Sequence, residues 1–337
     1  MSRGSLLPLG RRPLLGGALA AAASVRLGRA QTTAAAWAPS RPVTVVVPFS
    51  PGGTTDVMAR LIAGPMGRSF GQTVVVENAT GAGGNVGAAR VARAEPDGHT
   101  ALLAHIGVLS VNRHLYRNMS FDAARDFAPV GLLCTNPMLL LVSARSGIAD
   151  LEELKARARQ GSLRVATSGS GSTMHLAALQ FLRAVGGRAD LIPYRGGGPA
   201  VNDLLAGTID MLLEQALGGT QHVLGGGAKA FTVTGPERLA ALPAVPTAAE
   251  AGLPGLDIQI WNALVLPAGA APAVVAAHGA ALAAAMEDEA VRARFVLLAA
   301  RLPGGDERTP EFLGRLMARD AERWGALLRA TGVEVEG

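Results

Sequence analysis

The 337-residue sequence contains a single cysteine, Cys134, so the chain cannot form an internal disulfide bond. The apolar neighbours Leu132, Leu133 and Met138 predict a buried, small hydrophobic residue rather than a reactive thiol. The sequence also lacks a His-Glu-x-x-His zinc motif, paired cysteines and a Gly-x-Ser-x-Gly nucleophile turn, and its six histidines do not have metal-ligand spacing. We therefore expect no catalytic residues, no metal site and no cofactor.

The apolar segment at residues 13–23 is too short to cross a bilayer, which needs about 20 apolar residues. It follows the pair Arg11 and Arg12, and residues 1–30 hold five arginines and no acidic residue. This pattern predicts an export signal peptide over residues 1–30 and no membrane insertion of the mature chain. The paired arginines are compatible with the twin-arginine route, and the general secretory route stays open. The cleavage position stays open between Ala30 and the alanine clusters on either side.

The chain outside the signal segment has almost no net charge, because the five arginines of residues 1–30 account for the whole formal net charge of +5. The remaining chain is near neutral, which argues against a basic groove for nucleic acid. A mature chain of about 300 residues exceeds what one hydrophobic core usually organises, so we expect two domains. The 49% content of hydrophobic residues is sufficient to fill both.

Short β-branched runs alternate with helical patterns along most of the chain, which predicts an α/β fold with largely parallel sheets. The expected strands are residues 43–48, 73–77, 100–104, 128–133, 138–142, 163–167, 190–193, 209–213, 229–233 and 258–266. Helices are expected between them.

A glycine turn, Phe49-Ser50-Pro51-Gly52-Gly53, joins the first expected strand to an amphipathic helix. The first N–H groups of a helix lack intrahelical partners and carry partial positive charge, so this turn predicts an anion site. The two glycines let an oxyanion approach the backbone without a side chain in the way. Thr54, Thr55 or Asp56 is expected to cap the helix, and we interpret Asp56 as a cap and dipole partner. The alternative is an ordinary strand-to-helix turn.

A second glycine segment, residues 78–87, also follows an expected strand and opens a helix. It is similar to the dinucleotide fingerprint G-x-G-x-x-G, but Val86 stands where the third glycine is required. The sequence therefore argues against a Rossmann nucleotide site.

The order and spacing of short segments over about residues 42–330 resemble the Bug family of periplasmic solute-binding proteins, the receptors of tripartite tricarboxylate transport systems. The first of these segments reads Val-Pro-Phe-Ser-Pro-Gly-Gly-Thr-Thr-Asp over residues 47–56. The others are residues 76–78 with 81–84, 96–98, 112 with 115–116, 126–130, 171–172 with 175–176, 193–197 with 199–200, 203–204 with 207 and 210, 243–247 with 250–252, and 267–269.

The resemblance implies a two-lobed periplasmic-binding-protein type II fold, with two mixed or parallel sheets flanked by helices and a ligand cleft between the lobes. In this family the chain crosses twice between lobes. Here we expect the crossings near residues 130–138 and 261–266. Lobe 1 is then discontinuous, comprising residues 42–132 plus 262–337, and lobe 2 comprises residues 133–261.

The resemblance also implies a function. The chain would be an extracytoplasmic receptor, acting as a monomer in the periplasm of a Gram-negative cell, that captures a small carboxylate in its cleft. Its partners would be the subunits of a membrane transporter or a sensor, with no nucleic acid involved. Two alternatives remain open: an α/β cleft enzyme of the hydrolase type, and a periplasmic scaffold with a degenerate site.

Lobe 2 contains two further strand-to-helix turns that we expect to face the first one. Residues 166–173 read Ala-Thr-Ser-Gly-Ser-Gly-Ser-Thr, which would line a helix N-terminus with hydroxyl groups. The alternative is a solvated serine-glycine loop. The turn at residues 193–199 adds bare backbone and Tyr194, which could close over a ligand or simply pack.

Two titratable residues follow expected strands at the carboxyl ends, where α/β folds bind ligands. His105 follows the third strand, where relatives carry small hydroxyl residues, so a relative's ligand cannot be transferred to this chain. Glu214 would need a cation, a hydroxyl donor or a proton beside an anion site. It could instead pair with Arg195.

The predicted ligand-binding residues come from these turns and strand ends. They are Phe49, Ser50, Pro51, Gly52, Gly53, Thr54, His105, Ser170, Ser172, Thr173, Tyr194, Gly196 and Glu214.

Overall fold

The computed structural model describes residues 37–170, 172–297 and 300–331. The predicted export signal, residues 1–30, and the last six residues of predicted lobe 1 lie outside the described residues.

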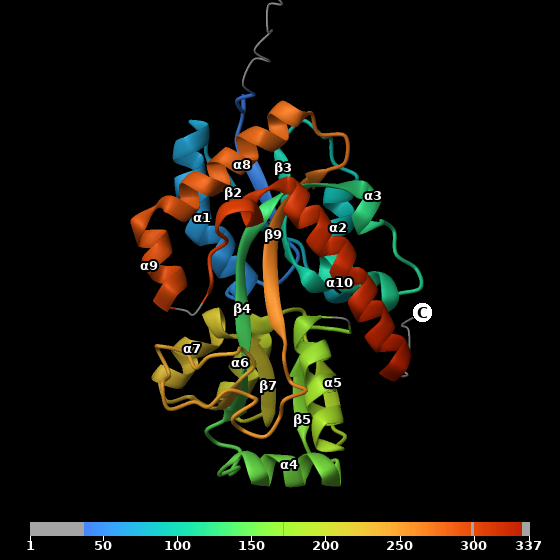
Figure 1. Ribbon diagram of the computed structural model, residues 1–337, viewed down its shortest axis with the longest axis vertical. Helices are drawn as coiled ribbons and strands as arrows, with labels where there is room; N and C mark the ends of the chain where they lie inside the picture. The colour runs from blue at the N-terminus through green and yellow to red at the C-terminus, as the bar shows by residue number, and fades with distance from the viewer. Residues whose placement is uncertain (1–36, 171, 298–299, 332–337) are drawn as a thin grey trace, which may run out of the picture. The chain divides into compact units, whose positions relative to one another are not determined.

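Nine strands and ten α-helices alternate along the described chain (Figure 1). The strands are β1 (Val43–Val47), β2 (Val74–Asn78), β3 (Thr100–His105), β4 (Phe127–Ser143), β5 (Arg164–Thr167), β6 (Asp190–Pro193), β7 (Met211–Gln215), β8 (Ala228–Val233) and β9 (Gln259–Pro267). The α-helices are α1 (Thr54–Phe70), α2 (Asn85–Ala92), α3 (Ala123–Asp126), α4 (Leu151–Gln160), α5 (Thr173–Val185), α6 (Gly197–Ala206), α7 (Ala216–Leu224), α8 (Pro272–Glu287), α9 (Glu289–Leu297) and α10 (Pro310–Thr331). Short 3-10 or π segments are η1 (Ala82–Gly84), η2 (Gly107–Val111), η3 (Asn112–His114) and η4 (Gly305–Arg308).

Strand β1 shows how local sequence and burial together select these elements. Its sequence Val-Thr-Val-Val-Val is almost entirely β-branched, and its side chains are buried except for the half-buried Thr44. It pairs in parallel with β2 on one side and with β3 on the other. Parallel strands need helical crossovers, which α1 and α2 provide.

The two longest strands, β4 and β9, run antiparallel side by side (Figure 1). The first part of β4, residues 127–137, pairs with β9, and the second part, residues 138–143, pairs with β7 and β8. The sequence predicted two separate strands in this region, but pairing to β9 continues through residues 134–137 and makes one strand of 17 residues.

The strand order is β2-β1-β3-β9-β4-β7-β5-β6, with β8 also paired to β4. Strand β4 therefore belongs to both of the predicted sheets and joins them into one hydrogen-bonded path. The predicted site residues lie at the carboxyl ends of β1, β3, β5, β6 and β7, in the turns that follow these strands or at the start of the next helix.

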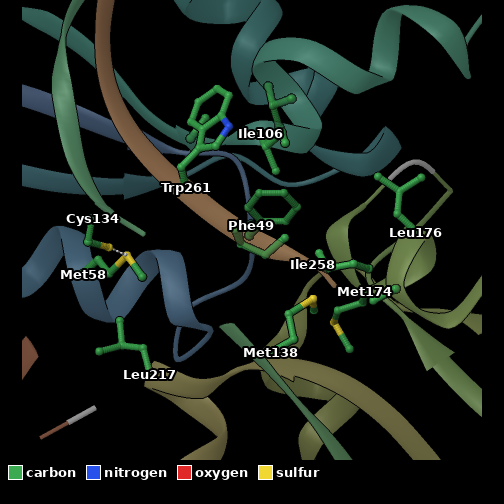
Figure 2. Close-up of a cluster of buried hydrophobic side chains, with 14 of the residues drawn as sticks. Phe49, Met58, Ile106, Cys134, Met138, Met174, Leu176, Leu217, Ile258 and Trp261 are labelled. Carbon is green, nitrogen blue, oxygen red and sulfur yellow. Dashed lines mark hydrogen bonds between the residues drawn. The ribbon is translucent and has the colours of Figure 1, made fainter. Parts of the chain in front are cut away.

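The buried apolar side chains form a continuous cluster that reaches the β1–α1 turn. Figure 2 shows Phe49 in this cluster close to Ile106, and Cys134 beside Met58. The Cys134 sulfur lies 3.7 Å from the Met58 sulfur. Burial raises the pKa of the Cys134 thiol, so the prediction of a buried, inert cysteine is confirmed. Over the described residues, no helix combines the length and hydrophobicity needed to span a membrane.

Candidate functional site

The β1–α1 turn places a helix N-terminus at the end of a buried strand. The N-cap of α1 is Gly53 rather than Thr54 or Thr55, and it provides no side-chain cap. Asp56 supplies the polar contact instead, because its Oδ2 accepts the Gly52 N–H at 2.9 Å. Burial alone would raise the pKa of Asp56, but hydrogen bonds from Arg60, Gly52 and Asn78 outweigh it and lower the pKa. The interpretation of Asp56 as a dipole partner is confirmed, because it is the acidic residue of the first turn of α1, but the N-cap position itself belongs to Gly53.

A second helix N-terminus, that of α6, lies directly against this turn. The Ser50 hydroxyl donates to the Arg195 carbonyl oxygen at 3.0 Å. A Cβ atom added to Gly196 would lie 2.8 Å from the Ser50 nitrogen, and one added to Gly198 would lie 2.9 Å from the Pro51 carbonyl oxygen. Glycine is therefore required for the two turns to approach this closely.

The two turns border an open cavity of about 330 Å³, here called the outer cavity. Its lining residues come from the β1–α1 turn, from α6 and α7, and from the end of β7. They are Ser50, Pro51, Gly52, Gly53, Thr54, Gly197, Gly198, Pro199, Val201, Asn202, Glu214, Gly218 and His222. None of these described lining residues is a lysine or arginine, so an anion here would be held by backbone N–H groups and hydroxyls.

A much smaller space of about 20 Å³, the inner cavity, shares four lining residues with the outer cavity. The other described residues around it are Phe49, Thr55, His105, Ser168, Thr173, Met174 and Gln215. A space of this size holds about one water molecule. The inner cavity brings the β5–α5 turn to the β1–α1 turn, as the sequence predicted for the two glycine-rich turns.

His105 lines the inner cavity, and a backbone hydrogen bond sets the tautomer of its ring. Its Nδ1 accepts the Gly107 N–H at 3.1 Å, so a neutral ring carries its proton on Nε2. The ring stacks on Phe49 with centroids 4.7 Å apart, and only 3% of His105 is exposed. Burial lowers the pKa of His105 to about 4, which keeps the ring neutral near pH 7.

Glu214 lies between the two cavities and contacts α1 directly. Its Oε1 accepts the Thr54 hydroxyl at 2.6 Å and the Gln215 N–H at 3.0 Å. Burial raises the pKa of Glu214, and these two hydrogen bonds offset the effect only in part. The ion pairs of the described residues do not join Glu214 to Arg195, which argues against the pairing that the sequence left open.

The serines of the β5–α5 turn make local contacts. Ser172 is the N-cap of α5, and its Oγ accepts the His175 N–H at 3.2 Å. The Ser170 carbonyl oxygen accepts the Tyr116 hydroxyl. Thr173, by contrast, lines the inner cavity. Ligand contact by Ser170 and Ser172 stays a prediction, and the structure assigns both to the shape of the turn.

Tyr194 is not among the described residues that line either cavity. Its hydroxyl donates to Asp203 Oδ2 at 2.6 Å. Burial and this hydrogen bond raise the pKa of Tyr194 to about 12. Of the two roles that the sequence left open for Tyr194, this structure shows the packing contact.

Several residues that line the cavities were not predicted from the sequence. Asn202 and His222 lie on the sides of α6 and α7, and only the packing of these helices brings them to the outer cavity. Gly218 matters because a Cβ atom there would lie 2.3 Å from the Thr54 hydroxyl oxygen. Gln215 adjoins the predicted Glu214, and Ser168 lies in the predicted turn at residues 166–173, so both could have been added from the strand-end argument. Among the described residues, no three His, Cys, Asp or Glu side chains are placed to hold a metal ion.

The protein is expected to lose stability in acid through His105. Its pKa is about 4 when folded and 6.5 in an ordinary environment, so the unfolded chain binds more protons between these values. The contribution of neutral His105 to the free energy of unfolding is fully present above pH 6.5 and is lost as the pH falls toward 4. From pH 7 to pH 5 it amounts to about 2 kcal/mol.

Urea unfolding of wild type and His105→Gln at both pH values measures this contribution. The glutamine can still accept the Gly107 N–H but does not titrate, so its loss between pH 7 and pH 5 should be about 2 kcal/mol smaller than that of wild type. Equal losses in the two proteins would contradict a buried neutral histidine.

Comparison with known proteins identifies the family to which this chain is similar. Residues 58–333 match the model of the tripartite tricarboxylate transporter family receptor. A relative from Pseudomonas sp. strain P51, the UPF0065 protein in the tcbD-tcbE intergenic region, is 39% identical over 328 residues, or 96% of this chain and 95% of its own length.

Two solved structures extend the comparison to the fold. The periplasmic binding protein BugD is 35% identical with a TM-score of 0.85, over 88% of this chain and 100% of its own. MatC from Rhodopseudomonas palustris with bound malate is 36% identical with a TM-score of 0.83, over 86% of this chain and 99% of its own. The chain therefore belongs to the receptor family of tripartite tricarboxylate transporters, shares the periplasmic-binding-protein fold of the Bug proteins, and is a solute-binding receptor.

Proposed function

We propose that this receptor captures a small carboxylate in the periplasm, at the cavity between the β1–α1 and β6–α6 turns. The observation that carries this proposal is the meeting of two helix N-termini at one cavity. A Cβ atom at Gly53 would lie 3.6 Å from the Gly198 nitrogen and 3.7 Å from the Gly197 nitrogen. The first-turn N–H groups of both helices lack intrahelical acceptors, so a carboxylate oxygen there would satisfy donors from both.

The size of the outer cavity favours a small acid. Its volume of about 330 Å³ lies at the lower end of the range for ligand pockets, which starts at roughly 300 Å³. MatC, which matches nearly the whole described chain, holds malate. A dicarboxylic or hydroxycarboxylic acid of similar size is therefore the ligand class that we propose, with water bridging part of the contact.

The proposed domain division places this cavity between two lobes. Residues 50–54 belong to proposed lobe 1, which comprises residues 42–132 plus 262–337. The lining residues from α6, β7 and α7 belong to proposed lobe 2, residues 133–261. A ligand here would contact both lobes, and a monomer with such a ligand could be recognised by transporter subunits or a sensor.

A thermal-shift screen tests the proposed function directly. Mono-, di- and hydroxycarboxylic acids should raise the melting temperature of the purified protein, whereas neutral sugars and metal cations should not. Saturation at 100 times Kd stabilises the folded state by about 2.7 kcal/mol, which a melting curve resolves easily. Mass spectrometry of ligand retained during purification would identify the natural acid.

Other outcomes of the screen would overturn the proposal in different ways. Tight binding of neutral sugars alone would exclude a carboxylate site. Turnover of a bound acid would favour the cleft enzyme, and no stabilisation by any acid would favour a scaffold with a degenerate site.

A further inference from the structure

The charges around the two cavities bear on how a dicarboxylate would bind there. Among the described lining residues, Glu214 is the one carboxylate and there is no lysine or arginine. The other titratable lining residues are His105 and His222. A ligand with two negative charges would therefore meet a third negative charge, on the buried Glu214, and no permanent cation, which is costly.

Glu214 is placed to meet the ligand with one oxygen. Only 5% of the residue is exposed, and Oε1 is already occupied by the Thr54 hydroxyl and the Gln215 N–H. Among the described residues, no hydrogen bond reaches Oε2. This oxygen lies 2.6 Å from the position that a Cβ atom would take at Gly197, so it borders the N-terminus of α6 and both cavities.

The neighbouring charged groups do not neutralise Glu214. On α1, Asp56 forms an ion pair with Arg60 at 2.9 Å, so the charge of Arg60 is matched by Asp56 rather than by Glu214. On β3, His105 is neutral because burial lowers its pKa to about 4. On α7, burial also lowers the pKa of His222, which favours its neutral form. From the β6–α6 turn, Arg195 contributes its carbonyl oxygen to Ser50.

We propose that a dicarboxylate binds to this receptor together with one proton, which Glu214 takes up on Oε2. This inference rests on the proposed function. The proton comes from solvent or buffer, a new O–H bond forms at Oε2, and that O–H donates a hydrogen bond to a ligand oxygen. Glu214 is then a donor rather than a third charge, and it keeps the hydrogen bonds to Oε1.

The environment of Glu214 favours this change even before the ligand arrives. Burial already raises its pKa, and a nearby carboxylate raises the pKa of a second carboxyl group further. An amino acid ligand behaves differently, because its ammonium group can pair with ionised Glu214. Proton uptake therefore distinguishes plain and hydroxy dicarboxylates from amino acids at the same site.

Isothermal titration calorimetry with malate measures the uptake. Titrations at a series of pH values in phosphate and in Tris, whose protonation enthalpies differ, give the number of protons bound per ligand. We expect a value approaching one in wild type at pH values where Glu214 of the free receptor is ionised. The Kd for malate should rise about tenfold for each pH unit over the range in which free Glu214 is ionised.

Two variants locate the proton. Glu214→Gln supplies a permanent N–H donor in place of the O–H and can still accept from Thr54. It should therefore take up no proton, lose the pH dependence of Kd and shift the ranking of ligands toward plain dicarboxylates. His222→Gln is the matched control for the other titratable residue at the outer cavity, and its proton uptake should equal that of wild type.

The outcomes separate this inference from the proposed function. If no acid in the thermal-shift screen binds wild type, the receptor proposal itself fails, and this inference with it. If malate or another dicarboxylate binds wild type without proton uptake, or if uptake persists in Glu214→Gln, the proton-linked site is wrong while the receptor function stands. Uptake that disappears only in His222→Gln would assign the proton to that histidine instead.

Discussion

Gly53→Asp is expected to weaken carboxylate binding by on the order of 100-fold or more, because like charges brought together at a binding site cost several kcal/mol. Gly53 stands where the N-termini of α1 and α6 meet, within 3.7 Å of two α6 nitrogens when a Cβ atom is added. An aspartate there would place its own carboxylate on the donors that we assign to the ligand. Calorimetry with the acid identified by the thermal-shift screen measures the loss.

The fold should survive this substitution. Gly53 has φ −75° and ψ 165°, an extended conformation that any residue adopts, and it is the N-cap of α1. Aspartate is among the preferred N-cap residues, so the helix should be no less stable. The Cβ atom would lie 3.4 Å from the Ser50 carbonyl oxygen, an ordinary contact.

Gly53→Ala is the matched control for size. It adds the same Cβ atom without the charge, so it should bind within about tenfold of wild type, since one moderate contact is worth about 1 kcal/mol. A folded Gly53→Asp protein, checked by circular dichroism, that binds within a few-fold of wild type would remove this turn from the site.

The local parts of this site could be predicted from the sequence because local chemistry determines them. The β-branched run of β1 followed by two glycines predicts a strand and an open helix N-terminus wherever the chain packs. The same reasoning places His105 and Glu214 at strand ends, and both line the inner cavity. These predictions needed only the periodicity of the strands and the backbone requirements of glycine.

The residues that were missed depend on tertiary packing. His222 faces the outer cavity because of the orientation of α7 against α1, which no local pattern specifies. The sequence left open whether Tyr194 contacts a ligand or packs. In the structure its hydroxyl donates to Asp203, nine residues away on α6. The sequence predicted two strands, residues 128–133 and 138–142, whereas pairing with β9 continues through residues 134–137 and joins them.

Closure of the two proposed lobes is the second large effect that we expect. In this structure Ser50 bonds to the Arg195 carbonyl oxygen and Thr54 bonds to Glu214, so both contacts join proposed lobe 1 to proposed lobe 2. A ligand that contacts both lobes stabilises this arrangement only by its higher affinity for it. Small-angle scattering should therefore show a smaller radius of gyration when the identified acid is added.

Gly196→Ala should prevent this closure without damaging either lobe. The added Cβ atom would lie 2.8 Å from the Ser50 nitrogen, a distance that forces the two turns apart, while the extended backbone at Gly196 accepts alanine. The acid should then bind about tenfold or more weakly, because the site is no longer completed from both sides, and the radius of gyration should not fall. Gly279→Ala, on α8, is the matched control, since its Cβ atom would meet nothing within 4 Å.

If wild type at saturation scatters like the free protein, the site is preformed, and a membrane partner would then have no change of shape by which to distinguish the loaded receptor from the empty one.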